Sequence, residues 1–285
     1  MDTLAASASI TKLAILGLGL IGGSLALAAK QRGIVQHVSA WGRRTQNLQT
    51  GLDRGVIDSF SLDLADVIVD ADVIVVATPV LMAEQLLVDL FAKHNTQAIV
   101  TDVGSTKGNL LRAVQQGLGY VPPNLVLGHP IAGSESSGID AVKVDLYERH
   151  RVILTPTSDT DAAHLACIQS LWSGVGAEVI CMDVEQHDHV LAATSHLPHM
   201  LAYSLVDTLS SMEEEQEVFR FAAGGFRDFT RIAKSHPTMW HDIAMANKSA
   251  LLKSLDDFVK HLLTVRECID QGDSERLIAL FSHVA

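Results

Sequence analysis

Ser105 and His129 are the side chains whose type and position best suit proton chemistry. Each lies in a loop directly after an apolar run with strand character, in segments 101–107 and 128–135. The carboxyl ends of strands in a doubly wound sheet face the ligand crevice, so we expect both residues there. Histidine titrates near neutral pH and can accept a hydroxyl proton, which makes His129 the favoured general base. A single loop histidine is more often structural, but the strand-end position and the flanking glycines favour catalysis here.

A glycine-rich turn, Gly-Leu-Gly-Leu-Ile-Gly, directly follows the predicted strand 12–16 and opens a predicted helix over 24–30. In such a turn the first glycine permits the bend, the second lets the backbone approach a pyrophosphate, and the third allows close helix packing. The spacing also occurs in turns without a ligand, but its place between a strand and a helix predicts dinucleotide binding. The predicted cofactor residues here are Gly17, Gly19, Leu20, Ile21 and Gly22.

Gly42 occupies the position after the second strand where NAD-binding proteins usually carry an acid that binds the adenine ribose. The residues that follow, Arg43, Arg44 and Thr45, supply two guanidinium groups and a hydroxyl, which suit a 2′-phosphate. We therefore expect NADP in preference to NAD. The alternative is that both arginines are solvated loop charges and that either cofactor is accepted.

Short β-rich runs alternate with longer helical stretches from residue 12 to about residue 183. Several runs are unbroken Val, Ile, Leu and Ala, as expected of strands covered on both faces. The pattern predicts an α/β fold, a Rossmann-type and mostly parallel sheet. Thr78 and Pro79 follow the third strand, where we expect the nicotinamide ribose. The predicted strands are 12–16, 35–41, 73–77, 98–102, 125–128, 151–155 and 178–182.

The character of the sequence changes after residue 183. Gly and Pro become sparse, and apolar residues fill segments 195–210 and 243–263, which predicts several long helices. We therefore expect two domains, a dinucleotide-binding domain over 1–183 and an all-α dimerisation and substrate domain over 184–285. A helical domain this small often shares its core with a second copy, so we expect a homodimer.

Charge and cysteine content exclude several classes of protein. The net charge is −12 and the basic residues are dispersed, so we expect no nucleic-acid partner. The three cysteines are widely spaced, which fits reduced thiols in the cytoplasm. No segment approaches the roughly 18 apolar residues of a membrane span, and residues 1–9 lack the pattern of an export signal.

Four histidines, His187, His189, His196 and His199, have spacings compatible with a metal site. We expect no metal, because a hydride-transfer site needs none. His187 and His189 lie in a charged segment and are predicted to be solvated. His199 is predicted to be an interior histidine bonded to a backbone carbonyl.

Five motifs together resemble the prephenate/arogenate dehydrogenase family of tyrosine biosynthesis. Two of them lie in the helical domain and are more specific than the glycine-rich turn. The match extends over about residues 12–258. The motifs are the segments 17–24, 102–107, 128–133, 194–199 and 224–233.

The resemblance implies oxidative decarboxylation of a cyclohexadienol. Hydride passes from the ring carbon that bears the hydroxyl to the nicotinamide, the hydroxyl proton leaves, and the ring carboxylate departs as carbon dioxide. Arogenate would give tyrosine and prephenate would give 4-hydroxyphenylpyruvate. We assign no residue that recognises the side chain by which arogenate differs from prephenate. We therefore expect the enzyme to accept both substrates. The resemblance also implies inhibition by tyrosine at the active site, and we expect no separate regulatory domain.

The same resemblance assigns roles to single residues. His129 would bond and deprotonate the ring hydroxyl, and Ser105 would hold that hydroxyl and orient the histidine. His196 would lie beside cofactor and substrate. Trp240 would close the pocket, in this family often from the partner subunit.

A dicarboxylate substrate needs a local cation in a protein of net charge −12. The resemblance implies that Arg231 binds a substrate carboxylate and that Asp228 gates access to the site. Arg227, four residues before Arg231, faces the same way if the stretch is helical. The alternative for Arg227 is an ordinary salt bridge with Asp228 or Glu217.

Two other functions fit parts of the pattern. A hydroxyacid or imine reductase of similar architecture usually relies on a helix lysine of its second domain, and Lys234, Lys248 and Lys253 are available. A nucleotide sensor would bind NADP without turnover. The combination of a base with a carboxylate-binding arginine counts against the sensor.

Overall fold

The computed structural model describes residues 10–134, 136–212, 219–221 and 223–283. The chain divides into two compact units. The first contains Met1–Asp188 and Lys234–Ala246, and the second contains His189–Ala233 and Asn247–Ala285. Within the described residues, no helix has the length and apolar character needed to cross a membrane.

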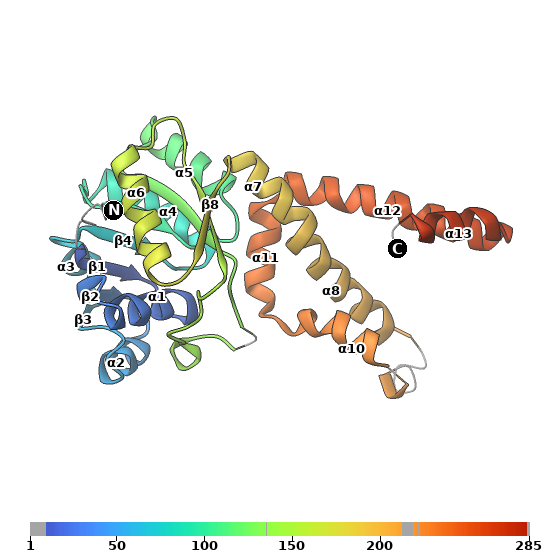
Figure 1. The fold of residues 1–285 in the computed structure, drawn as a ribbon, viewed down its shortest axis with the longest axis horizontal. Coiled ribbons are helices and arrows are strands. Elements are labelled where there is room, and N and C mark those ends of the chain that lie inside the picture. The colour runs from blue at the N-terminus through green and yellow to red at the C-terminus, as the bar shows by residue number, and fades with distance from the viewer. Residues whose placement is uncertain (1–9, 135, 213–218, 222, 284–285) are drawn as a thin grey trace, which may run out of the picture. The chain divides into compact units, whose positions relative to one another are not determined.

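An eight-stranded sheet forms the centre of the first unit, in the order β3-β2-β1-β4-β5-β6-β7-β8 (Figure 1). All neighbouring pairs are parallel except β6 and β7, which are antiparallel. The predicted α/β class and mostly parallel sheet are therefore confirmed. The strands are β1 (Ile10–Leu16), β2 (Val35–Trp41), β3 (Ser59–Ser61), β4 (Val73–Val76), β5 (Ile99–Asp102), β6 (Leu125–Pro130), β7 (Arg151–Thr155) and β8 (Glu178–Cys181).

Helices cover both faces of this sheet. Successive strand residues point to opposite faces, so Leu13 and Ile15 of β1 join one buried cluster while Ala14 and Leu16 join another. The first cluster includes residues of α1 and α6, and the second includes residues of α4 and α5. The helices of this unit are α1 (Leu20–Gln31), α2 (Thr45–Asp53), α3 (Leu64–Ile68), α4 (Val80–Ala92), α5 (Gly108–Leu118), α6 (Ala162–Gly174) and α11 (Pro237–Ala246), with a 3₁₀ turn at Ile139–Ala141.

Several strands differ from the sequence prediction, among them β3 and β6. The short strand β3 was not predicted, because Ser-Phe-Ser carries no apolar run and pairs only with β2. Strand β6 continues two residues beyond the predicted end at Gly128, because antiparallel pairing with β7 extends to Pro130. His129 is consequently a strand residue opposite Ile153 and not a loop residue as predicted.

The second unit is entirely helical in its described residues. The predicted helix over 243–263 is interrupted at Asn247, which has a non-helical backbone (φ −106°, ψ 31°) and is buried. Helix α7 (Val184–Leu191) runs from the first unit into this one. The remaining elements are the π-helical turn Ala192–His196, α8 (Leu197–Ser210), α10 (Gly224–Thr230), the 3₁₀ turn Arg231–Lys234, α12 (Lys248–Gln271) and α13 (Ser274–Ser282).

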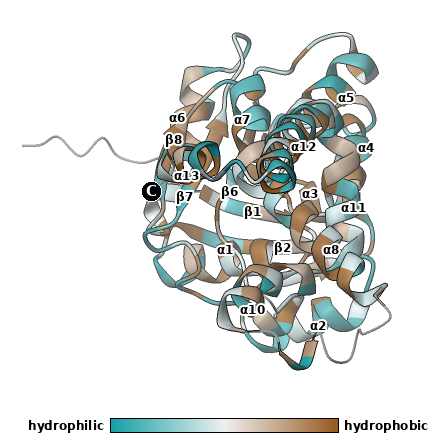
Figure 2. Ribbon diagram, turned by 90° about the vertical axis from the view of Figure 1, so that its right-hand side faces the viewer, coloured by the Kyte–Doolittle hydropathy of each residue, from teal (hydrophilic) through white to brown (hydrophobic). Residues whose placement is uncertain are grey.

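Helices α12 and α13 carry hydrophobic residues interleaved with hydrophilic ones (Figure 2). Several of the hydrophobic side chains are about half exposed or more, which is unusual for so many residues on two helices. They are Leu252, Val259, Leu262, Leu263, Ile269, Ile278 and Phe281.

Candidate active site

A cavity of about 300 Å³ opens at the carboxyl ends of β1, β2 and β4. It brings together seven of the predicted cofactor residues from three loops that are far apart in the sequence: Gly17, Gly19, Gly42, Arg43, Arg44, Thr78 and Pro79. Leu20, Ile21, Gly22 and Thr45 do not line the cavity. Leu20 and Thr45 are the first residues of α1 and α2.

The glycines of the turn have distinct structural reasons. Gly17 has φ +109°, and a Cβ there would lie 2.5 Å from the carbonyl oxygen of Ala77, so a side chain would be excluded. A Cβ on Gly22 would lie 2.7 Å from the Gly17 carbonyl oxygen, which makes Gly22 a packing residue. A Cβ on Gly19 would meet no atom within 4 Å, so open space lies in front of the backbone where α1 begins. This arrangement fits a dinucleotide whose phosphates approach the helix start.

Two arginines contribute to the lining of the cavity. Arg43 and Arg44 are exposed and line it beside Gly42. A Cβ added at Gly42 would come no closer than 3.5 Å to any atom, the nearest being on Leu48, so the glycine leaves room for a larger group. The residues present therefore fit an anionic ribose substituent.

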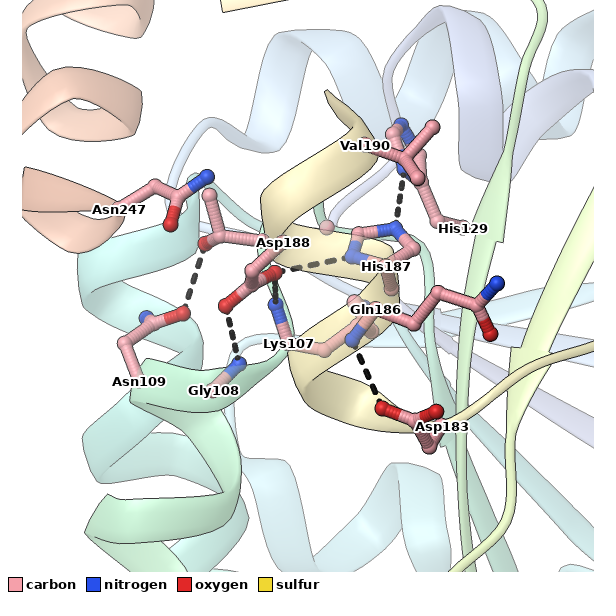
Figure 3. A network of polar contacts seen from close by, with 12 residues as sticks. Lys107, Gly108, Asn109, His129, Asp183, Gln186, His187, Asp188, Val190 and Asn247 are labelled. Carbon is pink, nitrogen blue, oxygen red and sulfur yellow. Dashed lines mark hydrogen bonds and ion pairs between the residues drawn. The ribbon is translucent and has the colours of Figure 1, made fainter. Parts of the chain in front are cut away.

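His129 lies at the carboxyl end of β6, buried to 8% exposure. Its Nδ1 is 2.9 Å from Nε2 of His187, which belongs to α7 (Figure 3). His187 is fully buried, so the prediction of a solvated histidine was wrong. The charged neighbours in the sequence concealed that His187 and Asp188 of α7 are buried, whereas His189 is exposed as predicted.

Asp188 connects this histidine pair to α5. Its Oδ1 is 2.9 Å from His187 Nδ1 and accepts the backbone N–H of Lys107 at 2.9 Å, and its Oδ2 accepts that of Gly108 at 2.8 Å. Burial alone raises the pKa of Asp188, but the hydrogen bonds from His187 and the two backbone amides bring that pKa below its ordinary value. The carboxylate is therefore ionised and accepts hydrogen bonds at the N-terminus of α5.

The turn between β5 and α5 contains the partly buried Ser105. Two residues later, the fully buried Lys107 forms an ion pair with Asp102 and donates from Nζ to the Gly128 carbonyl oxygen at 2.6 Å. Asp102 also accepts the backbone N–H groups of Gly104 and Gly128. These contacts join the ends of β5 and β6, so Ser105 and His129 lie at the carboxyl ends of neighbouring strands.

The remaining predicted site residues are divided between the units. Trp240 is buried in α11, which belongs to the first unit and packs on α4. His196 is buried in the second unit, and its Nδ1 lies 3.2 Å from the Asn247 amide nitrogen, a polar contact that holds the residue where the predicted helix breaks. Asp228 and Arg231 are exposed in the second unit, at α10 and the 3₁₀ turn after it.

Three smaller predictions concern polar residues near these positions. His199 is half-buried, and its Nδ1 is 2.9 Å from the carbonyl oxygen of Ser195, as predicted. Arg227 lies within α10, and its suggested partner Glu217 lies outside the described residues. Among the residues that the structure describes, no group of three or more His, Cys, Asp or Glu could hold a metal ion.

Two family models match adjacent parts of the chain. The prephenate dehydrogenase nucleotide-binding domain matches residues 25–181, and the prephenate dehydrogenase dimerization domain matches residues 183–283. The chain belongs to the prephenate dehydrogenase family. It is thus an oxidoreductase, and the family resemblance of the sequence motifs is confirmed.

Curated relatives and solved structures agree with this family. A cyclohexadienyl dehydrogenase from Zymomonas mobilis is 36% identical over 94% of this chain and 92% of its own length. A prephenate dehydrogenase from Bacillus subtilis is 38% identical over 93% of this chain and 72% of its own. The prephenate dehydrogenase from Aquifex aeolicus, solved with hydroxyphenyl propionate and NAD⁺, superposes with a TM-score of 0.89 at 36% identity, covering 98% and 97% of the two chains. The Synechocystis arogenate dehydrogenase gives 0.80 at 30% identity, covering 96% and 97%.

Within this prephenate dehydrogenase fold, sequence reasoning missed His187 and Asp188 as residues of the site. The available signal was a histidine next to an aspartate just after the last predicted strand. Neighbouring charges are a common feature of solvated helices, so only the inward direction of α7 distinguishes this pair.

Proposed function

We propose that this chain catalyses the NAD(P)-dependent oxidative decarboxylation of prephenate, arogenate or both in tyrosine biosynthesis. The observation that carries the proposal is the buried His129 at the carboxyl end of β6, within the nucleotide-binding domain of a prephenate dehydrogenase fold. The related proteins are named as cyclohexadienyl, prephenate and arogenate dehydrogenases, so acceptance of both substrates is consistent with the family.

The reaction balances with one base and one hydride acceptor. The bound nicotinamide supplies the hydride acceptor. His129 accepts the proton of the ring hydroxyl while the carbon that bears it loses hydride. The ring carboxylate then leaves as carbon dioxide, and its bonding electrons complete the aromatic ring as a phenolate, which takes the proton back from His129 to give the phenol. The driving force is aromatisation, so the residues need only orient the hydroxyl and remove its proton.

Ser105 and Arg231 complete the minimal site in this proposal. Ser105 follows β5, the strand next to β6, and its hydroxyl would hold the ring hydroxyl near His129. Arg231 would bind a substrate carboxylate through its planar guanidinium group. His196 would border cofactor and substrate, Trp240 would close the pocket, and Asp228 would gate access.

We favour NADP over NAD as the cofactor. The two arginines beside Gly42 support this choice, because they can bind a 2′-phosphate and no carboxylate repels it there. The Aquifex relative was solved with NAD⁺, so both cofactors belong in the assay.

We also propose an oligomeric state, an inhibitor and a cellular location for this enzyme. The exposed apolar residues of α12 and α13 and the match to a dimerization domain support a homodimer.

Tyrosine resembles the ring product and would compete at the substrate site. The three free cysteines support a reducing compartment, the cytoplasm.

The test is reduced-cofactor formation at 340 nm with prephenate and arogenate, each with NADP and NAD. We expect turnover with at least one pair and a loss of about 10²-fold or more in kcat for His129→Asn. His189→Asn makes the same substitution at an exposed histidine of α7. It is the matched control and should keep wild-type activity. Cofactor binding without turnover would overturn the proposal in favour of the sensor, and turnover of simple hydroxyacids or imines would favour the reductase.

A further inference from the structure

We propose that His187 and Asp188 are positioning residues that hold His129 in the tautomer able to act as a base. This inference rests on the proposed role of His129. It assigns a task to two buried polar residues that neither bind the predicted cofactor nor belong to the predicted substrate site.

Asp188 accepts two backbone N–H groups. Its Oδ1 accepts from Lys107, the residue before α5, and its Oδ2 accepts from Gly108, the first residue of α5; an ionised carboxylate can only accept. The nitrogen that faces it at 2.9 Å, Nδ1 of His187, must therefore carry the proton. In a neutral imidazole this leaves Nε2 of His187 as an acceptor.

The protonation state of His187 determines that of His129. Nε2 of His187 lies 2.9 Å from Nδ1 of His129, so the acceptor on His187 requires a proton on His129 Nδ1 (Figure 3). A neutral His129 protonated at Nδ1 has its lone pair on Nε2. A carboxylate that orients a histidine is a known way to select one tautomer, and here a second histidine transmits the selection.

The charges around His187 keep it in the neutral form that this chain of contacts requires. Burial lowers the pKa of His187 below its ordinary value, and the nearby Lys107 cation lowers it further, against the raising effects of Asp188 and Asp102. A doubly protonated His187 would donate at both nitrogens and could not accept from His129. His187 must therefore be neutral for its Nε2 to accept a hydrogen bond from His129.

Asp188 also links the base to the turn that carries Ser105. Its two backbone partners, Lys107 and Gly108, are the last residue of that turn and the first of α5. A single carboxylate therefore determines the tautomer of His129 and anchors the end of the segment containing Ser105.

The principal test compares His187→Leu with His187→Gln by steady-state kinetics. Leucine offers no acceptor to His129 Nδ1, whereas the glutamine side chain can still present a carbonyl oxygen. We expect His187→Leu to lower kcat by about 10²-fold, with substrate KM changed by less than about threefold. His187→Gln should recover a large part of the lost rate. The acid limb of the kcat profile should move to lower pH in His187→Leu, because His129 becomes a weaker base without its acceptor.

Two further variants separate this inference from the proposed function. In a His129→Gln background, His187→Leu should cause no further loss of kcat, because His187 acts through His129. His189→Leu is the matched control and should behave as wild type. If His129→Gln is inactive while His187→Leu retains full activity, the inference fails and the proposed function stands. If His129→Gln retains full activity, the proposed base itself is wrong.

A direct measurement reads the tautomer in the wild-type enzyme and needs a variant only to assign the signals. Histidine ¹⁵N shifts of the ¹⁵N-labelled wild-type enzyme, assigned with His129→Gln, report which ring nitrogen of His129 is protonated. We expect the Nδ1–H tautomer at pH values above the acid limb of the kcat profile. Observation of the Nε2–H tautomer would overturn the inference.

Discussion

The ammonium group of Lys107 is paired with the carboxylate of Asp102 at a position where both side chains have no exposed surface. The same ammonium donates to the backbone of Gly128, the residue before His129. Burial lowers the pKa of Lys107, and the charge of Asp102 opposes that effect. Each ion compensates the charge of the other. Removing one partner should therefore destabilise the fold more than replacing both partners with apolar residues.

Lys107→Met should therefore destabilise the enzyme strongly. Removing one partner of a buried ion pair costs about 3–5 kcal/mol, because the remaining charge is buried without compensation. Urea unfolding measures the change in free energy of unfolding. Lys93→Met is the control, since its bond to Asp89 is largely exposed and should contribute at most about 1 kcal/mol. Equal losses in the two variants would contradict the prediction.

Gly42→Asp should reverse the cofactor preference. The site has room for the side chain, and a carboxylate would repel a 2′-phosphate but could bond a ribose hydroxyl. We expect the affinity for NADP to fall on the order of 100-fold while NAD binding is maintained or improved. Titration of each cofactor by protein fluorescence tests this. Arg54→Gln, whose arginine pairs with Asp140 and does not line the cavity, should leave both affinities unchanged.

Arg231→Gln should weaken substrate binding without weakening cofactor binding. A charged hydrogen bond to a carboxylate contributes about 1.5–3 kcal/mol, which corresponds to an increase of roughly 10- to 100-fold in substrate KM. Arg227→Gln is the matched comparison, and a surface role there predicts a change of less than about threefold. A larger effect for Arg227 than for Arg231 would exchange their assignments.

His187 should make stability depend on pH. Its pKa in the folded enzyme is lowered from 6.5 by burial, so the unfolded chain binds the proton more readily. The stabilisation from neutral His187 is complete above about pH 6.5 and is lost as the pH falls toward the lowered folded pKa, by at most about 1.4 kcal/mol per pH unit. Unfolding free energies between pH 5 and 7.5 should show a flatter profile for His187→Leu than for wild type. His189→Leu should retain the wild-type slope.

Much of the cofactor domain could be predicted from local sequence alone. Apolar runs of β-branched residues identified all but one of the strands, because a strand buried on both faces needs apolar residues at every position. The roles of Gly17 and Gly22 could also be predicted from the local motif, because each lies so close to neighbouring backbone that a side chain is excluded. The helical character of the second unit followed from its periodicity, although Asn247 interrupts one predicted helix through a polar contact that no periodicity reveals.

By itself, the sequence determined the α/β class, the dinucleotide turn and the candidates His129 and Ser105, because these depend on local patterns and strand order. Only the tertiary structure decided that His187 is buried, that it contacts His129, and that Asp188 accepts backbone N–H groups at the N-terminus of α5. The physical reason is that hydrogen bonds between residues 58 or 80 positions apart depend on how elements pack and not on local composition. The direction in which one turn of α7 faces separates a solvated histidine from one that can orient a base.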